Sequence, residues 1–157
     1  MIDIVNFYGE MFKLGYSKIY HAGQFNIAYG DKNNRKLVED KKLDILLSPE
    51  RETRSGNLIV IDSGLNQVIC NIARKNNVTI GISFIDILKS KNRPILLARI
   101  MQNIRLCRKY RVKMVMASFA TNKYEMRDAR DLYNLCLVLG MNEREAKEAL
   151  NFRKKER

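Results

Sequence analysis

The fold is decided by one strand–helix–strand stretch, which reads VTIGISF at residues 78–84, RPILLARIMQNIRLCRKYR at 93–111 and VKMVMA at 112–117. The first and last runs are short, apolar and nearly continuous, which is typical of strands buried on both faces. The middle run has a helical pattern and follows a polar loop at 89–92. Because a helix that joins two such strands brings them into parallel pairing, the stretch predicts an α/β fold.

The same alternation extends to both sides of this stretch. Further strands are expected at 2–7, 18–20, 43–47 and 58–61, and further helices at 34–42, 65–76, 128–139 and 142–150. Ser63 is the expected N-cap of the helix that follows it. Gly140 is a natural helix stop, and Asn142 with Glu145 has the spacing of a capping box.

Length and composition exclude several classes of protein. The chain has 157 residues and a formal net charge of +12, from 29 Lys and Arg against 17 Asp and Glu. One domain over 1–157 fits that length, with a mobile loop at 48–56 and a frayed basic tail at 153–157. No apolar run approaches the roughly 20 residues that span a bilayer. The first residues carry an early Asp3 and no basic region, so a signal peptide is not expected.

Few side chains could hold a metal or carry out catalysis. His21 is the single histidine, which is too few for a polynuclear metal site, and the carboxylates do not cluster at a repeated spacing. The run DSGL at 62–65 could cap a helix or hold a phosphate, and no dinucleotide, Walker or nucleophile-elbow motif is present. Reduced core thiols of a cytoplasmic protein are expected at Cys70, Cys107 and Cys136. The sequence therefore predicts no catalytic residue, no metal site and no bound cofactor.

The strongest compositional feature is the segment 87–122, which contains no Asp or Glu. Its helix places apolar residues on one face and Arg99, Arg105 and Lys109 across from it. Basic helix faces usually carry acids that form i,i+4 pairs, so a face without acids leaves its cations available to phosphate oxygens. The predicted nucleic-acid contacts are Lys89, Lys91, Arg93, Arg99, Arg105, Arg108, Lys109, Lys123, Arg127 and Arg130.

Two alternatives remain open at this stage. Arg127 and Arg130 follow the strand over 112–117 and could line a functional rim, or they could pair with Asp128 and Asp131. The net charge suits nucleic acid, with an acidic membrane surface as the rival partner and an incidental basic surface as a third explanation. Aromatic residues near the basic segment are few, which favours recognition of RNA shape and backbone over base stacking.

Four motifs in order resemble a known family. They are LDILLSPE at 43–50, DSGLN at 62–66 leading to ARKNNV at 73–78, ASFA at 117–120 with YEMRDARDL at 124–132, and LGM at 139–141 with EAKEAL at 145–150. They are similar to motifs of the archaeal and eukaryotic ribonuclease P subunit of the thirty-kilodalton type, also called protein component three. The resemblance is strongest over 43–150. Phe119 departs from it, because it stands where the family usually has Gly.

The resemblance implies a TIM-barrel-like fold related to the polymerase and histidinol phosphatase superfamily, without that superfamily's metal-binding histidines. A complete barrel needs at least about 200 residues, so an incomplete or distorted barrel is expected here. The family's implied role is noncatalytic. It binds the catalytic RNA beside a second small protein subunit and supports 5′ maturation of precursor tRNA, while the RNA carries the chemistry with Mg²⁺.

Two other functions compete with this interpretation. The first is a divergent metal-dependent phosphoesterase on the same fold. The second is a protein–protein scaffold whose basic face is incidental. Phosphatase activity of the protein alone would favour the first. RNA binding that does not change when basic residues are replaced by acidic ones would favour the second.

Overall fold

The computed structural model describes residues 1–51 and 62–153, and its strands all run parallel. A two-stranded sheet pairs β1 with β2, and a four-stranded sheet has the order β3-β4-β5-β6. The strand bounds are β1 Ile2–Val5, β2 Lys18–His21, β3 Ile27–Tyr29, β4 Ile45–Leu47, β5 Thr79–Ser83 and β6 Met114–Ala117. The registers include Ile4 opposite Tyr20 and Gly81 opposite Val115. These facts confirm the α/β prediction and its parallel pairing.

The two sheets are joined where β1 meets the end of β6. The Phe119 N–H donates to the Ile4 carbonyl at 2.8 Å, and the Asn6 N–H donates to the Ala120 carbonyl at 2.7 Å. Asp3 adds a buried side-chain link, since its carboxylate accepts from the Ser118 N–H at 2.6 Å and from the Ser118 hydroxyl at 2.7 Å. The six strands that the structure describes therefore present their carboxyl ends at one edge, which we call the strand-end edge.

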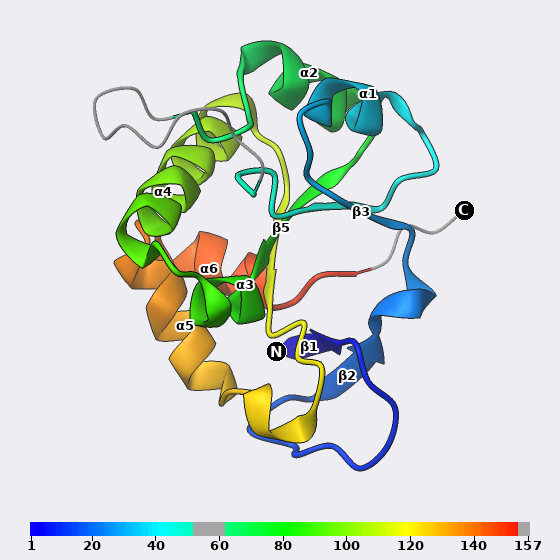
Figure 1. Ribbon diagram of the computed structural model, residues 1–157, viewed down its shortest axis with the longest axis vertical. Coiled ribbons are helices and arrows are strands. Elements are labelled where there is room, and N and C mark those ends of the chain that lie inside the picture. The colour runs from blue at the N-terminus through cyan, green and yellow to red at the C-terminus, as the bar shows by residue number, and fades with distance from the viewer. Residues whose placement is uncertain (52–61, 154–157) are drawn as a thin grey trace.

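The helices connect and cover these strands (Figure 1). Their bounds are α1 Asn34–Glu39, α2 Gln67–Lys75, α3 Phe84–Lys89, α4 Arg93–Tyr110, α5 Ala129–Val138 and α6 Glu143–Ala149, with short 3-10 turns η1 at Ala22–Gln24 and η2 at Lys123–Glu125. Helices α1 and α2 pack together at one end of the molecule, and α4 and α5 lie along one side. Phe152, which follows α6, packs against Phe25 just before β3.

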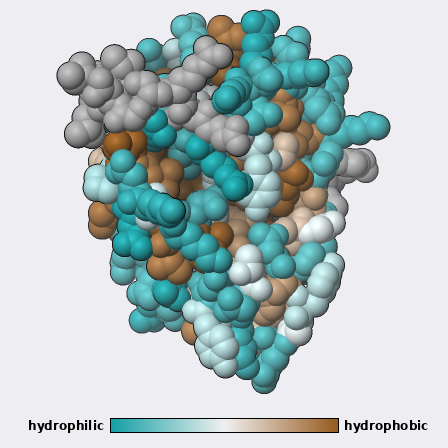
Figure 2. All heavy atoms as spheres, in the orientation of Figure 1, coloured by the Kyte–Doolittle hydropathy of each residue, from teal (hydrophilic) through white to brown (hydrophobic). Residues whose placement is uncertain are grey.

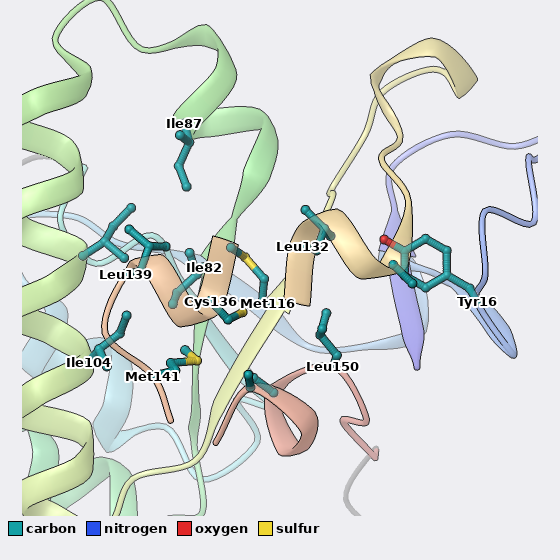
Figure 3. Packing of buried hydrophobic residues seen from close by; sticks show 14 residues of the cluster. Tyr16, Ile82, Ile87, Ile104, Met116, Leu132, Cys136, Leu139, Met141 and Leu150 are labelled. Atoms are coloured by element: carbon teal, nitrogen blue, oxygen red, sulfur yellow. The ribbon is translucent and has the colours of Figure 1, made fainter. Parts of the chain in front are cut away.

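Buried apolar residues fill the space on both faces of the strands. One cluster lies between the sheet and helices α4, α5 and α6, where Ile82 and Met116 of the strands meet Ile104, Leu132 and Leu150 (Figure 3). A second cluster lies under α1 and α2. A third is shared by β1, β4 and β6 and contains Phe25 and Phe152. Burial of both strand faces explains why the strand sequences are continuous rather than alternating.

Several local predictions are confirmed. Helix α4 keeps the predicted bounds to within one residue, and Arg111 ends it in a left-handed conformation. Asn142 and Glu145 form the capping box of α6, and Gly140 has a positive φ of 99° between α5 and α6. The described thiols of Cys70, Cys107 and Cys136 are free and buried.

Other local predictions are wrong. Phe84 begins α3 rather than ending a strand, because Ser83 at the end of β5 caps the helix through the Asp86 N–H. Asn66, not Ser63, caps α2, since its side chain accepts from the Ile69 N–H at 3.0 Å. Strand β3 had not been expected, and the predicted strand at 58–61 lies outside the described residues, as does most of the predicted loop at 48–56.

Candidate nucleic-acid interface

Helix α4 presents two exposed cations on its outer side. Ile100, Ile104 and Cys107 are buried against the sheet, as the helical spacing predicts. Arg105 and Lys109 are exposed one turn apart, and neither forms an ion pair with any described residue. The Lys109 ammonium lies 5.5 Å from the centre of the neighbouring Tyr110 ring. We call Arg105 and Lys109 the α4 cations.

Arg99 does not lie on that outer side. It is half-buried, with its Nε atom enclosed, and its charge acts on Glu50 in the loop after β4. Burial raises the pKa of Glu50 to about 7, while the Asn103 amide at 3.1 Å and the positive charge of Arg99 partly oppose the rise. The prediction that Arg99 projects outward with Arg105 and Lys109 is therefore wrong. Its charge acts on a buried carboxyl group of its own chain.

Arg108 holds α4 to α6. Its guanidinium donates to both Glu145 carboxylate oxygens, at 2.7 and 2.6 Å, and to the Gly140 carbonyl at 2.6 Å. These contacts raise the pKa of Arg108 and lower the pKa of Glu145. A fork-to-fork pair of this kind fixes the arginine geometrically. Arg108 is thus engaged within the protein, although its side chain remains partly exposed.

Of the three cations before and at the start of α4, two make contacts within the protein, and the third makes no ion pair with a described residue. Arg93 donates to the Ile87 and Leu88 carbonyls, at 3.2 and 2.7 Å, and so satisfies the end of α3. Lys89 pairs with Glu125 of η2 at 2.8 Å. That contact, together with bonds from Thr121, lowers the pKa of Glu125 to about 2. Lys91 is exposed between them and has no ion pair with any residue the structure describes.

Lys123, Arg127 and Arg130 lie after β6, at the strand-end edge. Arg127 donates to the Tyr124 and Met126 carbonyls and lies 5.4 Å from the centre of the Phe84 ring. Arg130 is exposed at the start of α5, and Lys123 lies 3.3 Å from the Glu10 carboxylate. Within the described parts of the chain, neither arginine forms the predicted alternative pair with Asp128 or Asp131. Asp128 instead caps α5 through the Arg130 N–H.

The structure adds two cations to the predicted set. Arg111 and Lys113 are exposed at the end of α4 and the approach to β6, beside a surface hollow of about 400 Å³ that α6 also borders. Both belong to the acid-free segment, so the signal that could have included them was present. They lie at the amino ends of the strands, away from Lys123 and Arg127. The basic residues of 87–122 therefore surround α4 rather than form one patch.

The single histidine lies at the end of β2. His21 accepts from the Gly23 N–H at 3.0 Å through Nδ1 and stacks on Tyr8, so it shapes a turn. Among residues 1–51 and 62–153, no three His, Cys, Asp or Glu side chains meet in a way that could hold a metal. In the same residues, no helix is both long enough and apolar enough to cross a bilayer.

Comparison with known proteins settles the family. The model of the family described as RNase P subunit p30 matches residues 27–154. The chain belongs to the RNase P subunit p30 family. That assignment confirms the resemblance seen in the four motifs, and it extends the matched region toward β3.

Members of the RNase P subunit p30 family with curated names are similar over most of this chain. Ribonuclease P protein component 3 of Methanosarcina acetivorans is 35% identical over 120 residues, covering 75% of this chain and 47% of that protein. The component 3 of Thermococcus gammatolerans is 31% identical over 125 residues, covering 78% and 55%. The chain spans about half the length of the curated relatives it matches.

A solved structure shares the fold. A chain from the cryo-EM structure of archaeal ribonuclease P with mature tRNA matches with a TM-score of 0.70 and 22% identity. The match covers 96% of this chain and 77% of that one. The arrangement of parallel strands and covering helices described above is therefore also found in a chain of that structure.

Proposed function

We propose that this chain is a noncatalytic protein subunit of ribonuclease P that binds the catalytic RNA and supports 5′ maturation of precursor tRNA. The observation that carries the proposal is the pair of α4 cations, exposed on a helix whose other cations are engaged within the protein. The names of the relatives and the source of the structural match support the assignment to this ribonucleoprotein.

The proposed mechanism is charge neutralisation. Where RNA helices pack together, their phosphates repel one another, and cations from protein can replace part of the Mg²⁺ that offsets this repulsion. The expected partners are the ribonuclease P RNA and other protein subunits, especially one small subunit that shares the catalytic RNA domain. Precursor tRNA is an indirect partner, no membrane contact is expected, and Mg²⁺ is assigned to the RNA.

The proposed fold is an incomplete TIM-barrel-like one, related to the polymerase and histidinol phosphatase superfamily. The strand order β2-β1-β6-β5-β4-β3, with hydrogen bonds between β1 and the end of β6, supports a curved array. The apolar cluster shared by β1, β4 and β6 fits the interior of such an array. A cytoplasmic location is proposed as well, supported by the free, buried thiols.

The carboxylates near the strand ends support the noncatalytic assignment. Asp3 is bonded to Ser118, Asp86 accepts from the Ser48 hydroxyl at 2.6 Å, and Glu125 is paired with Lys89. Each of these groups has partners within its own chain, whereas a phosphoesterase needs carboxylates available to metal or substrate. The phosphoesterase alternative is kept as an outcome of the test below.

The test is reconstitution of precursor-tRNA cleavage at limiting Mg²⁺, using the RNA and the other protein subunits with and without this chain. The chain is expected to raise the cleavage rate, and the Arg105→Ala/Lys109→Ala variant is expected to raise it less. The matched control, Arg144→Ala/Lys147→Ala, removes two exposed cations that are paired with acids of α6. No effect of the wild-type chain would overturn the proposal, and cleavage by the protein alone would support the phosphoesterase.

A further inference from the structure

Exposed aromatic side chains gather at the strand-end edge. Tyr8 follows β1 and is 82% exposed, and Tyr124 follows β6 in η2 and is 76% exposed. The connection between β1 and β2 lies beside η2 at the lower end of Figure 1, and Phe12 of that connection contacts Tyr124. Because β1 and β6 are hydrogen-bonded neighbours, rings more than a hundred residues apart in sequence share one surface.

The Tyr8 ring is held flat against His21. The two ring centres lie 3.8 Å apart with an interplanar angle of 16°. His21 is itself oriented by the Gly23 N–H, and a Cβ at Gly23 would come within 3.0 Å of the His21 Nδ1 atom. The turn therefore fixes the imidazole, and the imidazole supports an exposed tyrosine ring. Because the ring is already fixed, little conformational entropy is lost when another planar group stacks on it.

The Tyr124 ring is accompanied by a cation. Phe12 meets it edge-on with ring centres 6.3 Å apart, and the Lys123 ammonium lies 5.4 Å from the Phe12 centre and 5.5 Å from the Tyr124 centre. Glu10, which is highly exposed, lies 3.3 Å from the same ammonium. A third ring, Tyr29 at the end of β3, has the Arg51 guanidinium 5.3 Å from its centre. Rings and cations are thus paired along this edge.

We propose that the strand-end edge binds single-stranded RNA by stacking bases on Tyr8 and Tyr124, with Lys123 holding phosphate. The proposal rests on the proposed function and names the class of RNA that this edge takes. Unpaired bases stack on aromatic rings whatever their sequence, and neighbouring cations follow the backbone. The separate rings were not evident as a site in the sequence, because they come from three different places in the chain, after β1, at the end of β3 and after β6.

The composition of the edge favours RNA over a protein partner. A protein interface of ordinary size has a continuous apolar centre. Here, Figure 2 shows pale residues of intermediate hydropathy among hydrophilic ones at the lower end of the molecule, rather than one large hydrophobic patch. The exposed aliphatic residues Val68 and Val138 lie elsewhere, on α2 and α5. The net charge of +12 also suits a polyanion.

The experiment measures binding of the full chain to a fluorescently labelled 12-nucleotide oligouridylate and to a blunt 12-base-pair RNA duplex, over a range of salt concentrations. Tyr8→Ala/Tyr124→Ala is expected to weaken single-strand binding about tenfold or more and duplex binding less than twofold, since stacking is lost. Its salt dependence is expected to stay unchanged. Lys123→Ala is expected to lower the log–log salt slope by about 0.7, the value for one phosphate contact on a single strand.

Two matched variants control for folding and for hydrophobicity. Tyr8→Phe/Tyr124→Phe keeps both rings and is expected to bind the oligouridylate like the wild type. Val68→Ala/Val138→Ala removes exposed apolar groups elsewhere and is expected to change nothing. Circular dichroism and thermal melting check that each variant is folded.

The outcomes separate this proposal from the function it rests on. Wild-type-like single-strand binding by the double alanine variant would overturn the stacking proposal, as would equal losses for single strand and duplex, or no single-strand binding by the wild type. If the edge docks a protein instead, the wild type is expected to show no single-strand binding. If the wild-type chain still stimulates precursor-tRNA cleavage, the proposed function stands while the stacking proposal falls.

Discussion

The outer side of α4 and the strand-end edge both carry cations, yet they use them differently. On α4, Arg105 and Lys109 are exposed and form no ion pair with the described residues. At the edge, Lys89 pairs with Glu125, and Arg127 is bonded to backbone carbonyls. A helix displays side chains through its own backbone hydrogen bonds, whereas connections at strand ends need side-chain contacts to keep their shape. Lys89 and Arg127 therefore serve structure at the edge, whereas the α4 cations remain available.

Some of the polar contacts near the edge are also buried, whereas the α4 cations are exposed. Asp3 and Ser118 are completely buried, and Asn34 is nearly so, with its amide donating to the Pro49 carbonyl at 2.8 Å and the Gly64 carbonyl at 3.0 Å. Loss of a buried partner leaves polar groups without water or protein to bond. Substitutions of these buried groups should therefore reduce stability, and substitutions of the α4 cations should reduce binding.

The largest effect is expected at Asp3. Asp3→Ala removes the acceptor of the Ser118 N–H, the Ser118 hydroxyl and the Ile4 N–H, all at the junction of the two sheets. Stranding these buried donors should lower the free energy of unfolding by about 3–4 kcal/mol. Urea unfolding at pH 7 measures the change.

Asp3→Asn is the matched control, because it keeps an acceptor oxygen and the side-chain volume. It should cost clearly less than Asp3→Ala. Equal losses in the two variants would show that the carboxylate charge, rather than the hydrogen bonds, holds the junction.

The next effect concerns Glu50, which connects the strand-end edge to α4 through Asn103. Burial raises its pKa from 4.5 to about 7, so the folded protein binds this proton more tightly than the unfolded chain. The corresponding stability is fully present below about pH 4.5 and is lost as pH rises through 7. The expected loss between pH 5 and pH 8 is about 2–3 kcal/mol.

Glu50→Gln should remove this part of the pH dependence and keep an acceptor for the Asn103 amide. The comparison of unfolding free energies at pH 5 and pH 8, wild type against variant, isolates Glu50 from other titrating groups. A variant with an unchanged pH profile would mean that Glu50 stays ionised in the folded state.

A smaller effect is expected at Arg108, which lies on α4 but is bonded within the protein, as Lys89 and Arg127 are at the edge. Arg108→Ala removes the paired bonds to Glu145 and the bond to the Gly140 carbonyl. Because the pair is partly solvent-exposed, the loss should be about 1–2 kcal/mol. A double-mutant cycle with Glu145→Gln measures the coupling.

Arg105→Ala, three residues away on the same helix, is the control and should change stability by less than about 0.5 kcal/mol. If both arginines cost the same, the distinction between an engaged and an available cation does not hold on this helix.

Much of the fold could be predicted because its signals are local. The apolar spacing of α4 and the capping box of α6 depend on residues within one or two helical turns, and both predictions are confirmed. Strand β3 escaped prediction because it is only three residues long and incompletely buried. Helix α3 escaped because it follows β5 with no loop between them, so that Ser83 both ends the strand and caps the helix.

The site was less predictable, for a physical reason. The segment 87–122 has no acid in its sequence, but the acids that meet its cations come from elsewhere, such as Glu125 for Lys89 and Glu145 for Arg108. The positive charge of Arg99 likewise acts on an acid from elsewhere, since it partly opposes the rise in the pKa of Glu50. An acid-free stretch of sequence is therefore not an acid-free surface. Only the three-dimensional structure shows which cations are available and which are engaged within the protein.

The smallest effect is expected from the α4 cations themselves, and it concerns binding rather than stability. Arg105→Ala/Lys109→Ala should leave the melting temperature nearly unchanged, because neither side chain has an ion-pair partner among the described residues. RNA affinity of the wild type should fall steeply with salt, and the double variant should lower the log–log slope by about 2, since about 0.9 is lost for each duplex phosphate contact.

Binding to ribonuclease P RNA, measured from about 50 to 300 mM KCl, gives both slopes. The control Arg144→Ala/Lys147→Ala has the same change in net charge, so it shows how much of the slope comes from charge alone rather than from position on α4. A slope that falls equally in both variants would mean that RNA responds only to overall charge. A slope that falls only when Arg105 and Lys109 are removed places the phosphate contact on α4, and a variant with the wild-type slope places it on other cations, with Arg111 and Lys113 as the next pair to remove.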